Sequence, residues 1–205
     1  MSEEMLKIYG DSRSGNCYKI QLLCAELGIE YDWEEVDILA GDTRTPQFLA
    51  MNANGRIPLL ELPDGRYLAE SNSILYYLAD GSEFFAGDTY ERADILRWMF
   101  FEQYSHEPYI ATSRFIIKYL RNPADRRSAL EEKKAGGLAA LAILDQQLRG
   151  QPFITGDNYN IADIALFAYT HVADEGGFDL EDYPAIRAWI EHIIGRPNYV
   201  PMKEK

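Results

Sequence analysis

A serine stands between the first predicted strand and the first predicted helix, in the run Ser14-Gly15-Asn16-Cys17. Backbone N–H groups and the helix dipole converge at such a helix start and stabilise an anion there. A thiolate is such an anion, and helix N-termini lower the pKa of thiols. Redox folds with this strand order carry Cys-x-x-Cys here, whereas this chain has Ser-x-x-Cys. Ser14 cannot form a disulfide, but its hydroxyl can donate to the thiolate of a bound ligand; the alternative is that it only caps the helix.

A second candidate is Ile57-Pro58, which follows Gly55-Arg56 and precedes an apolar strand. A proline at the start of a strand removes one ladder hydrogen bond. In the cis form it would turn the backbone groups of Ile57 outward, toward the start of the first helix. The sequence leaves the isomer open, and an ordinary trans proline at the strand edge is the alternative.

A third candidate is Glu70-Ser71-Asn72, at the start of another predicted helix. The Ser71 hydroxyl and the adjacent N–H groups can hold a ligand carboxylate, while Glu70 accepts from an ammonium. An α-amino acid head group carries both charges together. The alternative is that Ser71 is a plain helix cap.

Other polar residues give weaker or purely structural signals. Asn160-Ile161-Ala162-Asp163 has the pattern of a capping box, which we assign to folding. His171 and His192 lie in helical segments and are expected to be packed or solvated, so His106 is the histidine to consider near a site. No histidine–cysteine spacing supports a zinc site, and none of the glycine patterns of phosphate-binding loops occurs.

Hydrophobic spacing places the three candidates on a small domain of alternating strands and helices. Strands are predicted over Met5–Tyr9, Tyr31–Val36, Pro58–Leu62 and Tyr67–Leu68, and helices over Ser14–Leu27, Thr43–Met51 and Ser71–Ala79. The order β-α-β-α-β-β-α predicts an α/β domain with a mixed four-stranded sheet over residues 1–80.

Strand signals nearly vanish after a predicted linker at residues 81–88, so residues 89–205 are expected to form an all-helical domain. Helices are predicted over Tyr90–Gln103 with a continuation through Leu120, and over Asp125–Leu148, Ile161–Val172 and Tyr183–Ile194. Pro108 is expected to kink or divide the first of these. Gly136-Gly137 is expected to weaken the second by roughly 1 kcal/mol per glycine relative to alanine.

Composition limits the classes of partner. The 205 residues include 33 acidic and 20 basic side chains, a formal net charge of −13. That balance argues against nucleic acid and anionic membranes, but a small anionic ligand needs only two or three local cations. The sequence has no run of about 18 apolar residues, no signal-peptide pattern near its start and only two cysteines. We therefore expect a cytoplasmic, reduced protein without a membrane span.

Taken in order, four segments resemble the glutathione transferase superfamily across nearly the whole chain. Ser14–Lys19 is similar to the start of the first helix in its serine-type and bacterial classes. Gly41–Leu49 with Asn52–Pro58 resembles its second-helix and cis-proline segment, and Glu70–Ile74 resembles its third-helix start. Asn160–Asp163 resembles the capping motif of its C-terminal domain, with Asn where Ser or Thr is usual.

The resemblance implies a thioredoxin-like N-terminal domain, a helical C-terminal domain and a homodimer. It implies glutathione as the cosubstrate, with no metal, and Ser14 as the hydroxyl that donates to its sulfur. Tyr9, near the catalytic position of tyrosine-type classes, is an alternative, and Ser12 is a third choice. Ser14 is preferred because it lies fourteen positions before Gly28, as the resemblance to serine-type relatives implies.

The remaining roles also come from the resemblance. Ile57, ahead of a cis Pro58, would pair its backbone with the cysteinyl amide of glutathione. Glu70 and Ser71 would hold the γ-glutamyl amino and carboxylate groups. Two groups of side chains complete the implied site: Arg44 and Arg56 for the glycyl carboxylate, and Tyr104, His106 and Arg114 as candidates for the wall of an electrophile pocket between the domains.

The implied activity is transfer of glutathione to small hydrophobic alkyl or aryl electrophiles, a detoxification reaction. One alternative is a glutathione-dependent disulfide reductase, peroxidase or isomerase; another is a non-catalytic glutathione-binding module. Serine at position 14 disfavours the cysteine-type redox classes. It leaves open disulfide chemistry in which two glutathione molecules do all the exchange. Cys17, at the second cysteine position of the redox pattern, is expected to be a small buried apolar residue.

Overall fold

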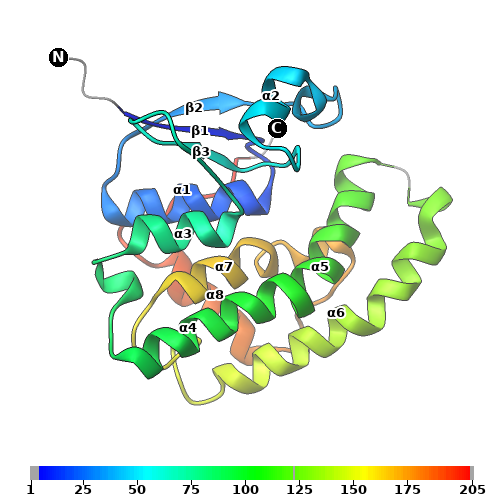
Figure 1. Ribbon diagram of the computed structural model, residues 1–205. Coiled ribbons are helices and arrows are strands. Elements are labelled where there is room, and N and C mark those ends of the chain that lie inside the picture. The colour runs from blue at the N-terminus through cyan, green and yellow to red at the C-terminus, as the bar shows by residue number, and fades with distance from the viewer. Residues whose placement is uncertain (1–4, 122, 204–205) are drawn as a thin grey trace. The chain divides into compact units, whose positions relative to one another are not determined.

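The computed structural model describes residues 5–121 and 123–203, which form two compact units (Figure 1). The first unit runs to Asp80 and includes the segment that begins at Asn198, and the second spans Gly81–Pro197. The sequence placed residues 89–205 together in the helical domain. The end of the chain instead groups with the first unit, where the Tyr18 hydroxyl donates to the Val200 carbonyl at 2.6 Å.

The first unit is built on a four-stranded sheet in the order β2-β1-β3-β4. Its strands are β1 (Leu6–Gly10), β2 (Tyr31–Glu35), β3 (Leu59–Glu61) and β4 (Tyr67–Ala69). β1 is parallel to β2 and antiparallel to β3, which in turn is antiparallel to β4. This is the predicted thioredoxin-like arrangement with a mixed sheet.

Three helices pack on this sheet: α1 (Gly15–Leu27), α2 (Pro46–Met51) and α3 (Ser71–Ala79). Figure 1 shows α1 and α3 side by side on one face of the sheet and α2 on the other. Phe48 of α2 packs against Leu59 and Tyr9. Ile8 and Leu60 pair in register and are fully buried on the opposite face, because successive strand residues alternate sides.

The second unit is helical. Its helices are α4 (Thr89–Phe101), α5 (Glu107–Arg114), α6 (Arg127–Leu148), α7 (Ile161–Thr170) and α8 (Pro184–Ile194). Every residue of α7 is buried, so this helix forms the centre of the unit's core. The predicted capping box at its start is confirmed.

Two expectations about helix breakers can be compared with the structure. The first long helix is divided near Pro108 as expected: a π-helical segment, η3 (Glu102–His106), precedes α5, and Pro108 lies in the first turn of α5. α6 runs unbroken through Gly136 and Gly137. A Cβ at either position would lie 2.3 Å from an aromatic ring, of Tyr109 and Phe178 respectively, so both glycines serve close packing.

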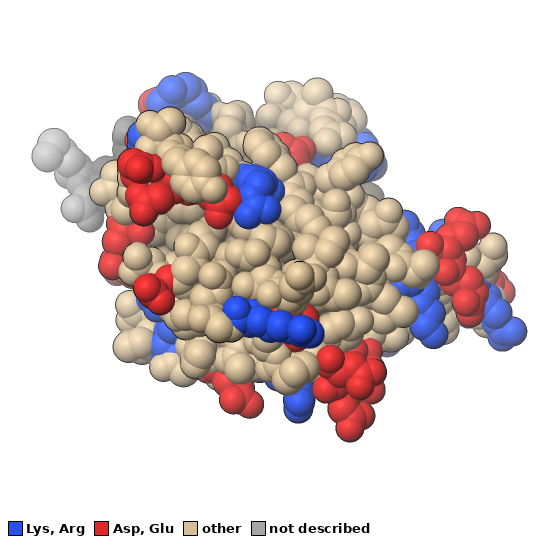
Figure 2. Space-filling model, turned by 90° about the horizontal axis from the view of Figure 1, so that it is seen from below, with Lys and Arg blue, Asp and Glu red and all other residues tan. Residues whose placement is uncertain are grey.

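The surface carries scattered charge. On the face shown in Figure 2, the basic side chains of the described residues are separated from one another by acidic and uncharged surface. Among the helices of residues 5–121 and 123–203, none combines the length and the apolar character that crossing a membrane requires.

Candidate functional site

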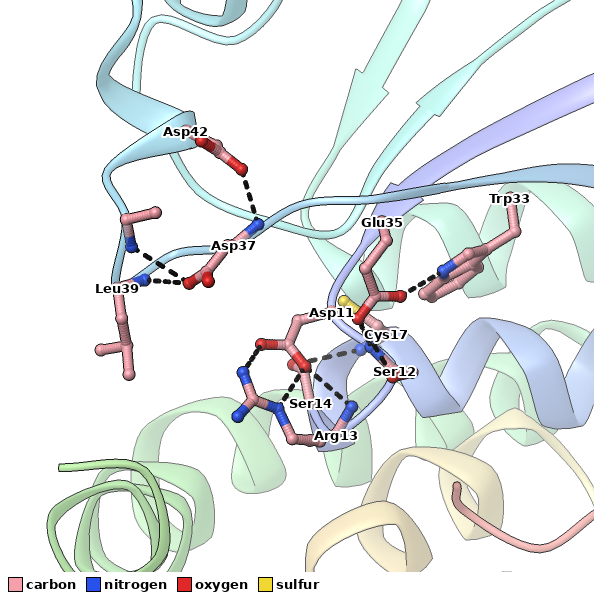
Figure 3. Close-up of polar contacts among 11 residues, drawn as sticks. Asp11, Ser12, Arg13, Ser14, Cys17, Trp33, Glu35, Asp37, Leu39 and Asp42 are labelled. Carbon is pink, nitrogen blue, oxygen red and sulfur yellow. Dashed lines mark hydrogen bonds and ion pairs between the residues drawn. The ribbon is translucent and has the colours of Figure 1, made fainter. Parts of the chain in front are cut away.

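The turn between β1 and α1 presents the Ser14 hydroxyl at the start of the helix (Figure 3). Ser14 is the cap residue, with extended backbone angles, and its Oγ accepts the N–H of Cys17 at 3.5 Å. Its side chain is half-buried, and the first turn of α1 contains no acidic residue. Ser14 thus caps the helix, through a long hydrogen bond, and remains accessible at the positive end of the helix dipole.

Two carboxylates hold this turn in place, as Figure 3 shows. The buried Asp11 accepts the backbone N–H of Arg13 at 2.9 Å and its guanidinium at 2.7 Å. Glu35 of β2 accepts both the N–H and the hydroxyl of Ser12, at 3.2 and 3.0 Å. The Ser12 hydroxyl is therefore donated to a carboxylate, which makes it a poor donor to a ligand.

The Tyr9 hydroxyl, like that of Ser12, donates to a carboxylate. The acceptor is Glu61 Oε2 at 2.7 Å, across from β1 to β3. Burial and the Glu61 carboxylate raise the pKa of Tyr9. Of the three hydroxyls considered from the sequence, Ser14 is the one that donates to no carboxylate among the described residues.

The two cysteines are buried in α1. Burial raises the pKa of Cys17 to about 12, which outweighs the opposing hydrogen bond from Ser14. Burial likewise raises the pKa of Cys24 to about 12. Because thiolates are the reactive form, burial disfavours both side chains as nucleophiles at neutral pH.

The Ile57–Pro58 peptide bond is cis, the isomer that the sequence alone left open. β3 begins two residues after Ile57, at Leu59. No described residue accepts the N–H of Ile57 or donates to its C=O. Both backbone groups are thus available to an extended peptide ligand, as an added strand would use them.

The start of α3 differs from the expectation for Ser71. The cap residue is Glu70, whose side chain makes no capping bond, and Ser71 is the first residue of the helix. The idea that Ser71 caps this helix is therefore wrong. Glu70 is exposed and has a φ of 70°, a strained conformation of a kind that concentrates at functional sites.

Ser71 is buried and belongs to a polar network that the sequence analysis missed. Its hydroxyl donates to Asn16 Oδ1 at 3.2 Å and accepts from Lys19 Nζ at 3.2 Å. The signal in the sequence was the polar pair Asn16 and Lys19, one turn apart in the first predicted helix. In the structure, residues Cys17 to Ile20 of that helix are all fully buried. Four consecutive buried residues mean that this turn has no solvent face.

Arg44 and Arg56 are both exposed, one on each side of a short loop. Arg44 Nη1 donates to the Asn54 carbonyl at 3.2 Å. Gly55 has a φ of 60°, and a Cβ there would lie 2.6 Å from Arg44 Nη1, so this loop needs glycine. Asn52 orders the loop by donating to the Arg56 carbonyl at 2.8 Å.

The three residues proposed for an electrophile pocket have different environments. Tyr104, in η3, is 84% exposed. His106 is fully buried, with Nε2 2.9 Å from the Thr170 hydroxyl. Arg114 is buried and donates to Glu175 Oε2 at 2.6 Å. Only the Tyr104 side chain is open to a ligand, and the other two are held inside the helical unit.

The described residues contain no cluster of histidine, cysteine and carboxylate side chains that could hold a metal ion. The arrangement in the first unit is instead suited to a peptide thiol. It offers a hydroxyl and a helix start for a thiolate, open backbone groups for a peptide, and separate charged groups for two peptide ends.

Comparison with known proteins finds matches over both units. Residues 13–80 match the model for the N-terminal domain of glutathione S-transferases, and residues 97–197 match the model for their C-terminal domain. The chain is 31% identical over 189 residues to the disulfide-bond oxidoreductase YfcG of Escherichia coli (strain K12), covering 89% of this chain and 87% of that protein.

Two solved structures extend the comparison. A glutathione S-transferase from Pseudomonas fluorescens has a TM-score of 0.95 and 54% identity, covering 98% of this chain and 100% of that one. A glutathione transferase from Burkholderia graminis has a TM-score of 0.82 and 27% identity, covering 95% of this chain and 85% of that one. The latter structure contains two glutathione molecules bound per subunit.

Proposed function

The chain belongs to the glutathione S-transferase superfamily, and on that premise we propose that it activates the thiol of glutathione and conjugates it to small hydrophobic electrophiles. The observation that carries this proposal is that the Ser14 hydroxyl donates to no carboxylate among the described residues. This hydroxyl lies half-buried at the start of α1, whereas the hydroxyls of Tyr9 and Ser12 are donated to Glu61 and Glu35.

Activation consists of stabilising the thiolate of bound glutathione. The Ser14 hydroxyl donates a hydrogen bond to the sulfur, and the positive end of the α1 dipole attracts the thiolate charge. A fall in thiol pKa from about 8.5 to about 6.5 corresponds to roughly 2.7 kcal/mol and makes the thiolate the major form at pH 7. The thiolate then forms a bond to the electrophilic carbon, the leaving group departs with its electron pair, and the thiol proton goes to solvent.

The rest of the peptide is held by the groups around the turn. The open N–H and C=O of Ile57, ahead of Pro58, pair with the cysteinyl residue of glutathione. Glu70 binds the γ-glutamyl ammonium, and the start of α3 at Ser71 binds the neighbouring carboxylate. Arg44 and Arg56 are exposed cations for the glycyl carboxylate, which explains how a chain of net charge −13 binds an anionic peptide.

The second substrate needs an apolar surface, and Tyr104 is the proposed residue whose ring is accessible to it. Phe100 of α4 is also 69% exposed. We further propose that the protein is a homodimer, and sedimentation velocity tests that state. We propose a cytoplasmic location because both cysteines are free thiols, as in reducing compartments.

The test is the ultraviolet absorbance of the glutathione thiolate, titrated against pH with the wild type and with Ser14→Ala. A bound thiol pKa well below that of free glutathione, restored toward it by the substitution, supports the proposal. An unshifted pKa in the wild type contradicts it and favours a binding role. A shift that persists in Ser14→Ala moves the assignment to Tyr9, Ser12 or the helix terminus.

A second candidate function is glutathione-dependent disulfide reduction. It is favoured by the name of the Escherichia coli relative. Burial raises the pKa of both thiols to about 12, so in this reaction glutathione itself would have to supply the attacking thiolate. With no protein thiolate available, one glutathione thiolate attacks the disulfide and releases a thiol. A second glutathione then attacks the mixed disulfide, which yields oxidised glutathione and the second thiol.

Parallel assays separate the two functions. An aryl halide, a small disulfide and a hydroperoxide are offered with glutathione to the wild type and to the double variant Cys17→Ala, Cys24→Ala. Conjugation of the aryl halide supports the leading proposal. Disulfide reduction that survives loss of both cysteines, without conjugation, supports the second.

A further inference from the structure

Glu35, the last residue of β2, ties the β1–α1 turn to the sheet. Its Oε1 accepts both the N–H and the hydroxyl of Ser12, at 3.2 and 3.0 Å. Ser12 is the second residue of a four-residue turn, which closes where the N–H of Ser14 donates to the Asp11 carbonyl at 2.9 Å. Because the turn is so short, a bond that fixes Ser12 also fixes the place where Ser14 begins α1.

The Glu35 carboxylate is itself held from its other side. Its Oε2 accepts from the indole Nε1 of Trp33 at 2.7 Å, as Figure 3 shows. Trp33 lies two residues earlier on the same face of β2, because strand residues alternate between the two faces. The indole fits there because position 10 is glycine: a Cβ on Gly10 would lie 2.7 Å from the ring. The carboxylate is therefore restrained in the orientation that receives Ser12.

This arrangement distinguishes two serines that lie two positions apart at the same helix start. A hydroxyl has one proton to donate, and the proton of Ser12 goes to Glu35. Ser14 Oγ instead accepts the N–H of Cys17 at 3.5 Å, and within residues 5–121 and 123–203 its proton goes to no carboxylate. Glu35 thus occupies the one hydroxyl and leaves the other to a ligand.

The charge of Glu35 acts against a thiolate at this turn. Burial is the main cause of the raised pKa of Cys17, and the charges of Asp11 and Glu35 add to it. Cys17 lies in the first turn of α1, next to Ser14, so a thiolate bound at Ser14 is opposed by the same charges. Loss of the Glu35 charge alone should therefore lower the pKa of a bound thiol. Loss of the turn's position should raise it, so the two roles have opposite signs.

We propose that Glu35 is a positioning residue that makes Ser14, rather than Ser12, the hydroxyl offered to the thiol of glutathione. It acts through the two hydrogen bonds that it receives from Ser12, and it needs no contact with glutathione itself. This inference rests on the proposed function, because it assigns a further role in the activation of the same thiol.

The experiment titrates the ultraviolet absorbance of the thiolate of bound glutathione against pH. It uses the wild type, Glu35→Ala, Glu35→Gln and Glu34→Ala, and it needs no second substrate. Glu35→Gln removes the charge and keeps one carbonyl oxygen, which satisfies more donors at Ser12 than at Trp33. Glu34 is the matched control, an exposed glutamate of the same strand that pairs with Lys7 at 3.1 Å. Urea denaturation checks that each variant is folded.

Glu35→Ala should raise the bound thiol pKa by about 0.5–1 unit, even though it removes an opposing charge. Glu35→Gln should leave that pKa unchanged or lower it by up to about 0.5 units. Glu34→Ala should move it by less than about 0.2 units. In a Ser14→Ala background, Glu35→Ala should cause no further rise, because the effect passes through the position of Ser14.

Two results would overturn the inference. One is a folded Glu35→Ala variant whose bound thiol pKa is unchanged or lower, which would leave Glu35 a purely structural or electrostatic role. The other is a rise of equal size with and without the Ser14 hydroxyl. If Glu35→Ala does not fold, Glu35→Asp decides instead: it keeps the charge but is too short to reach Ser12, so an unchanged pKa contradicts the inference.

The same titration separates this inference from the function on which it rests. An unshifted thiol pKa in the wild type defeats the proposed thiol activation, and the role of Glu35 with it. A wild-type pKa that is lowered through Ser14 but does not respond to Glu35→Ala defeats the role of Glu35 alone.

Discussion

The starts of α1 and α7 are both capped by a short polar side chain, but only one of the two caps is closed. At α7, Asn160 Oδ1 accepts the N–H of Ala162 at 2.9 Å, and Asp163 Oδ2 accepts the N–H of Asn160 at 3.1 Å. At α1, Ser14 accepts one N–H at 3.5 Å, and its side chain is half-buried rather than enclosed.

The difference lies in which group faces the first N–H groups of each helix. α7 has its own acceptor, because the carboxyl group of Asp163 lies in its first turn and is fully buried there. α1 has no acidic residue in its first turn, and the neighbouring Asp11 and Glu35 carboxylates bond to Arg13 and Ser12, so the first N–H groups of α1 are left for an external anion. A helix start whose charge is satisfied internally serves folding, and one whose charge is unsatisfied can serve a ligand.

Asp163→Ala should have the largest effect, on stability alone. The Asp163 carboxylate accepts from Asn160, from the N–H of Ile154 at 2.9 Å and from the Trp189 indole at 2.9 Å. Its removal leaves these buried donors without that acceptor, which should lower the free energy of unfolding by roughly 3–5 kcal/mol. Urea denaturation measures this loss.

Asp157→Ala is the control for that measurement, because Asp157 is exposed on the neighbouring loop. It should change the free energy of unfolding by less than about 0.5 kcal/mol. The comparison between the caps fails if Asp163→Ala shifts the thiol pKa of bound glutathione while leaving stability intact.

Ser14→Ala should show the reverse pattern. Loss of the hydroxyl should raise the bound thiol pKa by about 1–2 units and lower kcat/KM near neutral pH by roughly 10–100-fold. The free energy of unfolding should fall by no more than about 1 kcal/mol, because the capping bond is long. Steady-state kinetics and urea denaturation on the same preparation give both numbers, and a large loss of stability with an unchanged pKa would make Ser14 a structural cap.

The contribution of His171, at the other end of α7, to the stability of the helical unit should fall with acid. His171 is the C-terminal cap residue of α7, stacked on Phe167 at 4.5 Å, and burial lowers its pKa from 6.5 to about 4. The folded state thus binds fewer protons than the unfolded chain between these values. Its contribution to stability is complete above pH 6.5 and is lost as pH falls through 6.5 toward 4.

Between pH 7 and 5 this loss should reach about 2 kcal/mol. Burial raises the pKa of Asp163 from 3.8 to about 7, so Asp163 acts in the opposite direction as pH rises through that range. Comparing the wild type with His171→Gln isolates the histidine. His192→Gln, at an exposed position, is the control and should keep the wild-type pH dependence.

The open cap and the closed cap were both visible in the sequence, because each depends on residue types at short spacing. Asn160 and Asp163, three apart, specify a capping box, and the structure has it. Ser14 ahead of a helical pattern specifies a helix start, but the pattern cannot tell a cap that is only structural from one that serves a ligand. That distinction depends on the partners of Tyr9 and Ser12, which come from other strands.

Contacts between residues distant in the chain determine features that the sequence pattern did not predict. Gly136 and Gly137 look like weak points in a helix, yet they admit the rings of Tyr109 and Phe178, which are distant in the chain. Lys19 is a charged residue, yet it is fully buried, as are its neighbours from Cys17 to Ile20 in α1. Periodicity identifies one apolar face of a helix, and it does not reveal when a second face is covered as well.

Tyr9→Phe should have the smallest effect, and for that reason it is the sharpest control on Ser14. The Tyr9 hydroxyl is already donated to Glu61 at 2.7 Å, so its removal takes nothing from a bound thiolate. The bound thiol pKa should move by less than about 0.2 units, and kcat/KM by less than about twofold. The free energy of unfolding should fall by about 1 kcal/mol, because Glu61 loses a partially buried donor. A thiol pKa that rises as far in Tyr9→Phe as in Ser14→Ala would show that the hydroxyl leaves Glu61 when glutathione binds. The open cap of α1 would then be a structural feature, and the activating group would lie on β1.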